Sequence, residues 1–176
     1  MIARFENVQG YNLVKAGTGK NAAGEMVAQY LFTLKKKNPL TYHDGKGGKM
    51  QPNRKYDGVG KVVARLLTDM GTIPKILQLL IPKDKYLLSF FYHDSAWEHG
   101  GIWYCAPGFE TYSFVEMGRM EANRLLRDMV LIEGAMDKTI KPGTLKREAR
   151  WIKRAVDLAA FWFAIKRRTP RHKRVR

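Results

Sequence analysis

An apolar stripe with helical spacing runs through residues 144–168 and constrains the fold more than any other feature. Its members recur every three or four residues and are Leu145, Ala149, Ile152, Val156, Ala159 and Trp162. This spacing places them on one face of a single long helix, and that face must be buried against other elements. Residues 161–163 are apolar around much of the helix circumference, so either another subunit or another part of this chain covers them.

Three shorter helices are predicted ahead of it, over residues 74–80, from about 84 to 100, and over 116–133. The first fits Thr72 as a cap and Pro74 in its opening turn. The third carries methionine, leucine and isoleucine on one face, and Gly134 is expected to end it. The aromatic stretch 102–112 between the last two is predicted to be a loop or a short strand.

The first 60 residues are rich in turn-forming residue types. Two short apolar pieces, Tyr11–Val14 and Met26–Leu34, favour strands, because β-branched and aromatic side chains suit a pleated surface. The stretch 35–57 begins with a run of lysines and continues with a glycine- and lysine-rich segment. Such a composition offers no face to bury, so a loop or extended arm is expected there.

These patterns predict an α+β fold with a mainly helical core from residue 72, a small N-terminal β-sheet and an extended basic arm. We divide the chain into N-terminal strands and arm (1–60), a helical core domain (61–165) and a basic C-terminal tail (166–176). A chain of 176 residues that is 45% hydrophobic is long enough for a single buried core.

Positive charge is the strongest deviation in composition. Lys and Arg total 32 against 16 Asp and Glu, for a net charge of +16. Such a chain is attracted to polyanions such as nucleic acid, anionic lipid or an acidic protein surface. Cys105 is the single cysteine, so no intramolecular disulfide and no cysteine-rich metal site can form. The longest apolar run, near 155–165, is shorter than the ~20 residues that span a bilayer, so no membrane span is expected.

Polar groups interrupt apolar runs at two places, Thr68–Pro74 and His93–Asp94. A polar side chain removed from water without a partner costs about 1–3 kcal/mol. We therefore expect these groups to hydrogen-bond to one another, and this is the part of the sequence that most resembles a site.

Three short blocks, Thr68–Pro74, Tyr86–Asp94 and Arg119–Asn123, resemble a small phage and prophage family known as domain of unknown function thirteen-fifty-three. The family pattern is Thr-Asp-x-x-Ser-Ile/Val-Pro, then an apolar helix into His-Asp-x-x-Tyr, then Arg-x-x-Ala-Asp. The similarity covers about residues 60–135. It implies an origin in a phage or prophage genome and little established chemistry.

The chain departs from this pattern at three positions. Thr72 stands where the family has serine and keeps the hydroxyl group. Trp97 replaces a tyrosine and retains only an N–H donor, and Asn123 replaces an aspartate and loses the negative charge. His93 and Asp94 remain.

Two interpretations of His93 and Asp94 stay open. In one, His93, Asp94 and Asp69 are catalytic, with His93 as general base, or Asp69 and Asp94 hold a divalent metal. Two carboxylates are few for a hard cation, which takes six or more oxygen ligands. In the other, which we favour, these residues form a buried hydrogen-bond cluster with Thr68 and Thr72 that fixes the loop to the helix. The loss of two polar family residues supports the structural role.

The candidate residues for binding a polyanion lie in two clusters. They are Lys35, Lys36 and Lys37, and in the tail Lys166, Arg167, Arg168, Arg171, Lys173, Arg174 and Arg176. The tail contains no acidic residue and is the best candidate in the chain for a binding element, the alternative being a solvated end that aids solubility.

These observations favour a phage virion or assembly protein that docks through its basic arm and tail to partner subunits or packaged DNA. The expected partners are other virion subunits and DNA, within a homo- or hetero-oligomer, and the expected location is the virion after synthesis in the host cytoplasm. One alternative is a small His/Asp-dependent hydrolase acting during infection, for which a divalent metal is a candidate cofactor; no cofactor is expected otherwise. Another is a phage protein that binds nucleic acid without sequence specificity.

Overall fold

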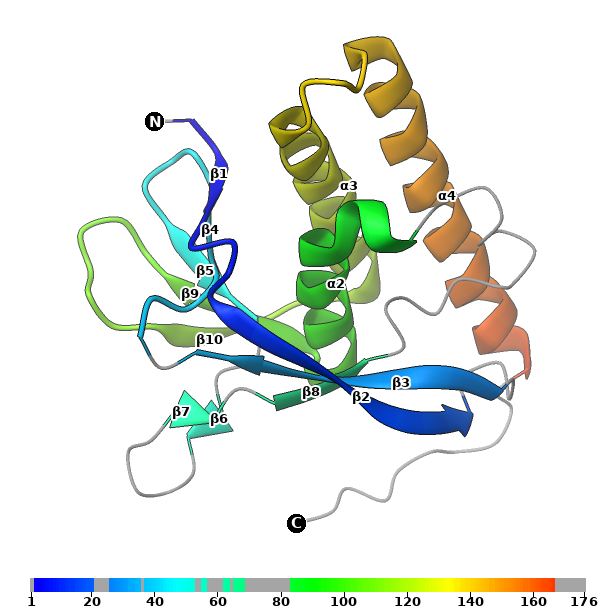
Figure 1. Ribbon diagram of the computed structural model, residues 1–176, viewed down its shortest axis with the longest axis horizontal. Coiled ribbons are helices and arrows are strands. Elements are labelled where there is room, and N and C mark those ends of the chain that lie inside the picture. Colours follow the sequence, from blue (N-terminus) through cyan, green and yellow to red (C-terminus); the bar gives the residue numbers. More distant parts are fainter. Residues whose placement is uncertain are drawn as a thin grey trace.

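The computed structural model describes residues 2–20, 26–35, 37–52, 55–56, 62–63, 65–68 and 83–166. The described residues form an α+β fold, which confirms the predicted class (Figure 1). Helices stand on one side of the molecule and antiparallel strands on the other. The predicted helix over 74–80 lies outside the described residues.

Five strands form the larger sheet, in the spatial order β1-β4-β5-β9-β10. Their bounds are β1 Arg4–Glu6, β4 Thr41–His43, β5 Lys49–Gln51, β9 Gly101–Cys105 and β10 Ser113–Glu116. Every neighbouring pair in this sheet is antiparallel. The sheet therefore combines strands from the first and the second half of the chain.

The remaining described strands form a three-stranded sheet and a short ribbon. The three-stranded sheet has the order β2-β3-β8, from β2 Tyr11–Lys20, β3 Met26–Leu34 and β8 Arg65–Thr68. The ribbon pairs β6 Lys55–Tyr56 with β7 Val62–Val63. The two strands predicted near the N-terminus are present, and β2 is longer than predicted.

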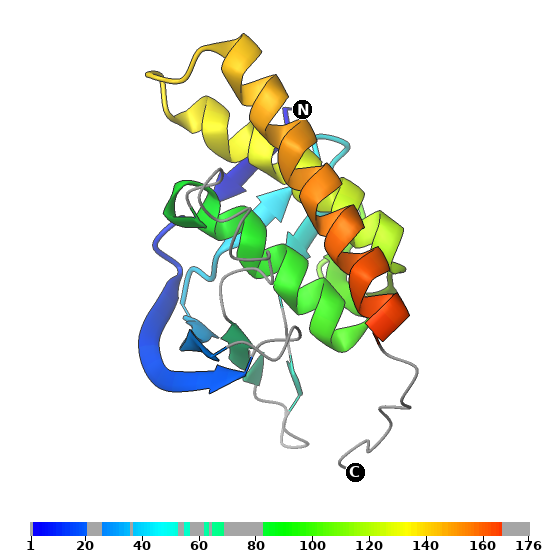
Figure 2. The same ribbon diagram turned by 90° about the vertical axis from the view of Figure 1, so that its right-hand side faces the viewer.

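The helical side consists of a short 3-10 helix η1 Lys83–Tyr86 and the helices α2 Leu87–His99, α3 Arg119–Met136 and α4 Pro142–Lys166. Helix α3 packs against both α2 and α4, and α4 is the outer helix of the three (Figure 2). The predicted apolar stripe of α4 is buried from Leu145 to Ala159. No helix within the described ranges is long and apolar enough to cross a membrane.

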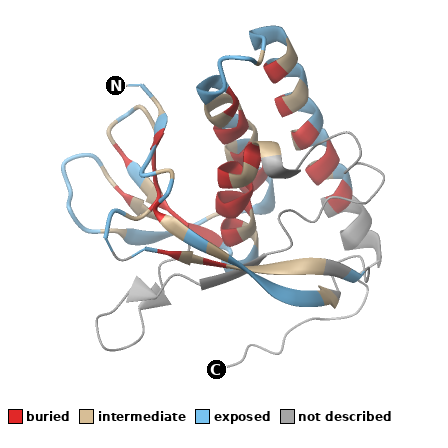
Figure 3. Ribbon diagram, viewed as in Figure 1, coloured by how far each residue is buried: buried red, intermediate tan, exposed pale blue. Residues whose placement is uncertain are grey.

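Helix α2 lies at the centre of the molecule and is buried on most sides (Figure 3). Three consecutive residues, Phe90, Phe91 and Tyr92, are fully buried. Consecutive residues point to different sides of a helix, so an amphipathic helix with a single buried face could not bury all three. Phe91 and Tyr92 belong to the core against the strands, whereas Phe90 belongs to the core against α3 and α4. This helix therefore joins the two halves of the hydrophobic interior.

The first turn of α2 is capped by a side chain from α3. The Glu133 carboxylate accepts hydrogen bonds from the backbone N–H groups of Leu88 (3.0 Å) and Ser89 (2.8 Å), and from the Ser89 hydroxyl (2.6 Å). Backbone N–H groups in the first turn of a helix have no partner within the helix, so this carboxylate satisfies two of them. Burial raises the pKa of Glu133, although the bonds from Ser89 and Leu88 act in the opposite direction.

The prediction of a loop or arm over residues 35–57 is wrong for the strands β4, β5 and β6, whereas residues 44–48 do form a turn. Strand β4 is buried along its whole length, and Leu40 before it is fully buried. The glycines serve the turn between β4 and β5, where Asp44 accepts the backbone N–H groups of Lys46 (2.7 Å) and Gly48 (2.9 Å). The residues on either side of this turn provide a buried apolar face that the composition of the segment did not indicate. The described residues before and after position 60 belong to one hydrophobic core.

Gly134 does not end α3, contrary to the prediction. It lies inside the helix, and a Cβ atom there would be 2.3 Å from Cδ1 of Leu145 on α4. The glycine therefore permits the close approach of α3 and α4 rather than a change of chain direction.

Candidate functional site

His93 lies on α2 and is almost completely buried, with 6% of its surface exposed. Its Nε2 atom is 2.9 Å from Oδ1 of Asn123, a fully buried residue of α3. The other ring nitrogen, Nδ1, is 3.4 Å from Oδ1 of Asp94, which is long for a hydrogen bond. Both nitrogens of the predicted general base thus face side chains of the same chain.

The polar contact continues from Asn123 to α4. The Asn123 amide donates through Nδ2 to Oδ1 of Asp157 (2.7 Å), and Lys153 donates to Oδ2 of the same carboxylate (2.5 Å). We call His93, Asn123, Asp157 and Lys153 the polar relay. It links α2, α3 and α4 through side chains, and each hydrogen bond along it joins a donor to an acceptor.

The relay determines which ring nitrogen of His93 carries the proton. The Asp157 carboxylate only accepts hydrogen bonds, so the Asn123 NH2 group faces it and the amide oxygen faces His93. That oxygen also only accepts, so Nε2 of His93 must donate. In the neutral ring, Nδ1 is the nitrogen left to act as a base, and it faces the Asp94 carboxylate.

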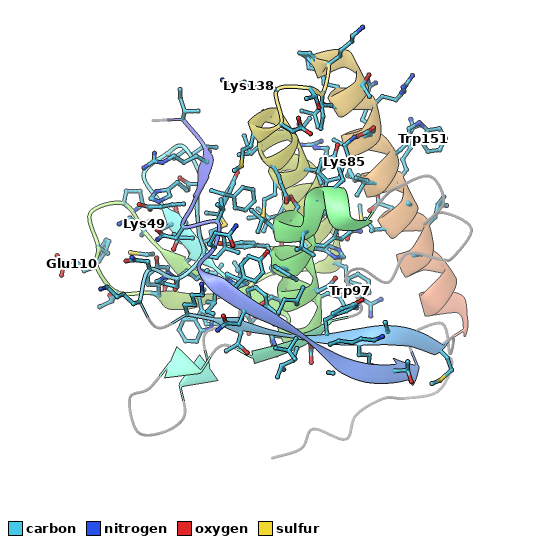
Figure 4. The ribbon with its side chains drawn as sticks, in the orientation of Figure 1. Lys49, Lys85, Trp97, Glu110, Lys138 and Trp151 are labelled. Atoms are coloured by element: carbon cyan, nitrogen blue, oxygen red, sulfur yellow. The ribbon has the colours of Figure 1, made fainter. Side chains whose placement is uncertain are left out.

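Trp97 packs beside the histidine, and Arg119 lies over the Trp97 ring. The Trp97 ring is 5.8 Å from the His93 ring, and the Arg119 guanidinium carbon is 4.9 Å from the Trp97 centroid, within range of a cation–π contact. Trp97 lies on the lower part of α2 in Figure 4. Trp97 therefore packs on the histidine.

Asp94 has a side chain that is 13% exposed, and it is not a free carboxylate. Its charge acts on Glu98, whose pKa is raised first by desolvation and second by Asp94. Asp69 and Thr72 lie outside the described residues, and so does the side chain of Thr68 in β8. The predicted joining of this loop to His93 therefore stays a prediction.

Among the residues that the structure describes, which exclude Asp69, no three His, Cys, Asp or Glu side chains are grouped so that they could hold a metal ion. His93, Asp94 and Asn123 were predicted from the sequence, whereas Asp157 and Lys153 were not. Their spacing of four residues on a helix is the signal that could have pointed to an ion pair.

A second candidate site is the solvent-facing side of α4. Nine residues between positions 141 and 158 are exposed, and none of them is acidic: Lys141, Pro142, Gly143, Lys146, Arg147, Arg150, Trp151, Arg154 and Leu158. We call Arg147, Arg150, Trp151, Arg154 and Leu158 the outer face of α4. Trp151 points away from the body of the molecule in Figure 4.

The two acidic residues in this part of α4 face inward and are paired with lysines. Glu148 accepts hydrogen bonds from Lys85 (2.8 Å) and from the Tyr86 hydroxyl. Burial acts to raise the pKa of Glu148, but these hydrogen bonds outweigh burial and the net shift is downward. Asp157 belongs to the polar relay with Lys153. The charge that α4 presents to solvent is therefore of one sign.

The predicted cationic clusters are only partly within the description. Lys35 and Lys37 are exposed, whereas Lys36 lies outside the described residues. Lys166 is the last residue of α4, and its side chain is not described. Arg167, Arg168, Arg171, Lys173, Arg174 and Arg176 also lie outside the described residues, and in sequence they directly follow α4.

Comparison of the chain with family models, with curated proteins and with solved structures found no match. The resemblance to domain of unknown function thirteen-fifty-three therefore stays a prediction.

Proposed function

We propose that this protein is a structural or assembly subunit of a phage particle, docked to polyanionic partners through the outer face of α4, the basic tail and the lysines at 35–37. The partners are acidic surfaces of other virion subunits or packaged DNA. The phage origin rests on the resemblance of residues 60–135. The docking function rests on charge.

The observation that carries the proposal is the uniform sign of charge along α4. Its exposed residues include five cations and no acidic residue between positions 141 and 158. A surface of one sign attracts a polyanion over a range set by ionic strength, about 10 Å at 0.1 M salt. In the sequence, the tail that follows Lys166 carries charge of the same sign.

The geometry of His93 supports a docking protein over a hydrolase. A general base needs a nitrogen directed at a substrate or a water molecule. Here one nitrogen donates within the polar relay and the other faces Asp94. The arrangement resembles a buried network that holds three helices in one packing.

The proposal is tested on particles purified by density from a strain that carries the gene. Mass spectrometry should find the chain in these particles, and a variant that ends at Lys166 should be depleted from them while remaining folded. A full-length chain that is absent from particles and stays monomeric in lysate would refute the particle assignment.

A further inference from the structure

The outer face of α4 carries an arginine row beside an exposed tryptophan. Arg147, Arg150 and Arg154 are separated by three and four residues, so they project within about 60° of the helix circumference. Trp151, which is 54% exposed, lies beside this sector on the helix surface. Leu158, which is 64% exposed, lies about two helical turns further along α4. Cations and an aromatic ring thus stand side by side on one rigid helix.

We propose that this face binds single-stranded nucleic acid, with the three arginines on successive phosphates and Trp151 stacked on an unpaired base. The inference rests on the proposed function and names the partner for one of its surfaces. The occupant follows from charge complementarity and from the ring, because every base has a face on which an aromatic side chain can stack.

The dimensions of the row suit one strand of a nucleic acid. Arg147 and Arg154 are about 10 Å apart along the helix axis at 1.5 Å per residue. A flexible single strand is not held at the duplex rise of about 3.4 Å per phosphate, so its backbone can adjust to place successive phosphates opposite the three arginines. In a duplex the bases are stacked on each other, and Trp151 would lack a free base face.

An anionic membrane fits this face less well. An interfacial helix inserts a continuous apolar face into the lipid. The apolar face of α4 is already buried against the rest of the protein, as Leu145, Ile152 and Val156 show. Among the side chains of α4 that the structure describes, which end at Ala159, Trp151 and Leu158 are the exposed large apolar residues.

An acidic protein surface also fits less well. Interfaces between proteins have an apolar or aromatic centre and place charges at the rim. On α4 the arginines occupy the middle of the exposed sector, and Trp151 stands at its edge. This order suits a charged polymer backbone with bases directed to one side.

The test compares four variants of the full chain for binding to a labelled oligothymidylate of about 16 nucleotides and to a duplex of equal length. Anisotropy titrations between about 50 and 200 mM salt give the affinity and its salt dependence. The variants are the triple Arg147→Gln, Arg150→Gln, Arg154→Gln; Trp151→Ala; Trp151→Phe; and a control triple. The control, Lys46→Gln, Arg124→Gln, Lys138→Gln, removes the same charge from exposed positions outside α4.

The arginine triple should lower affinity for the single strand about 100-fold near 0.1 M salt and reduce the slope of log K against log salt by about 2, since each phosphate contact contributes about 0.7. The control triple should change affinity by less than about threefold at the same salt, because its charges are not on the binding face. Trp151→Ala should weaken binding of the single strand by about 5- to 150-fold and binding of the duplex much less. Trp151→Phe should restore most of the loss.

Equal effects of the two triples would overturn the proposal, because they would show attraction to net charge alone. So would equal losses on the single strand and the duplex for Trp151→Ala. Binding of all variants to vesicles of anionic lipid but not to the oligonucleotide would favour a membrane surface. These outcomes are independent of the particle experiment, since a chain absent from particles can still bind the oligonucleotide through α4, and a particle subunit can fail to bind it.

Discussion

Replacing Asn123 by alanine should destabilise the protein strongly, because this side chain sits in the middle of the polar relay. It is fully buried and makes two hydrogen bonds, from Nε2 of His93 at 2.9 Å and to Asp157 at 2.7 Å. Alanine removes both. The buried N–H group of His93 is left without its acceptor, whereas Asp157 keeps its bond from Lys153.

The magnitude follows from these two unequal losses. An unsatisfied buried hydrogen-bond donor costs about 1–3 kcal/mol, and His93 has only 6% of its surface exposed to solvent. The Asp157 side chain is 27% exposed and keeps its pairing with Lys153, so losing the hydrogen bond from Asn123 costs less there, about 1 kcal/mol. We expect a loss of about 3 kcal/mol in the free energy of unfolding, and a fall in Tm of about 6–12 °C for a chain of this size.

Urea denaturation monitored by circular dichroism measures this loss, with Asn12→Ala on exposed strand β2 as the matched control at less than about 0.5 kcal/mol. A double-mutant cycle with His93→Ala should show a coupling of about 1 kcal/mol or more, since the two residues share a bond. A change below about 1 kcal/mol for Asn123→Ala, with no coupling to His93, would refute the structural role of the relay.

Two further predictions concern the packing of α3. Gly134→Ala should destabilise by about 1–3 kcal/mol despite the higher helix propensity of alanine, because the new Cβ would be 2.3 Å from Leu145, whereas Gly143→Ala, with nothing within 4 Å, should be neutral or stabilising by up to about 1 kcal/mol. Thermal unfolding of the two variants checks this, and equal effects would contradict the proposed close approach of α3 and α4. Because burial raises the pKa of Glu133 above its ordinary 4.5, its contribution to stability is full below that pH and declines as pH rises through the folded-state pKa. The stability of the native protein relative to Glu133→Gln should therefore be greater in acid than at neutral pH, as measured by urea titrations at both pH values. The opposite order would show that the hydrogen bonds from Ser89 outweigh the effect of burial on the pKa of Glu133.

Local patterns in the sequence predicted the elements whose stability depends on their own periodicity. The apolar stripe from Leu145 to Ala159 predicted the buried face of α4, because a period near 3.6 residues identifies a helix whatever it packs against. Residue types that suit a pleated surface predicted the strands β2 and β3, and the sequence also predicted the existence of α2 and α3. The basic charge of the chain also follows from composition alone.

Tertiary structure decided the features that depend on partners distant in the chain. Strand β5 pairs with β9 about fifty residues later, and that pairing buries a hairpin whose composition is typical of an exposed loop. Gly134 permits a helix crossing because Leu145 of α4 lies opposite it.

The polar relay and the outer face of α4 arise in the same way. Spacing within α2 shows that His93 and Asp94 are neighbours, but the bond to Asn123 exists only because α3 crosses α2 at that level. The row Arg147, Arg150 and Arg154 could be found by counting along the sequence. Its exposure without an acidic neighbour required that Glu148 and Asp157 turn inward to lysines. Periodicity determines which residues share a face, and packing determines which faces meet water.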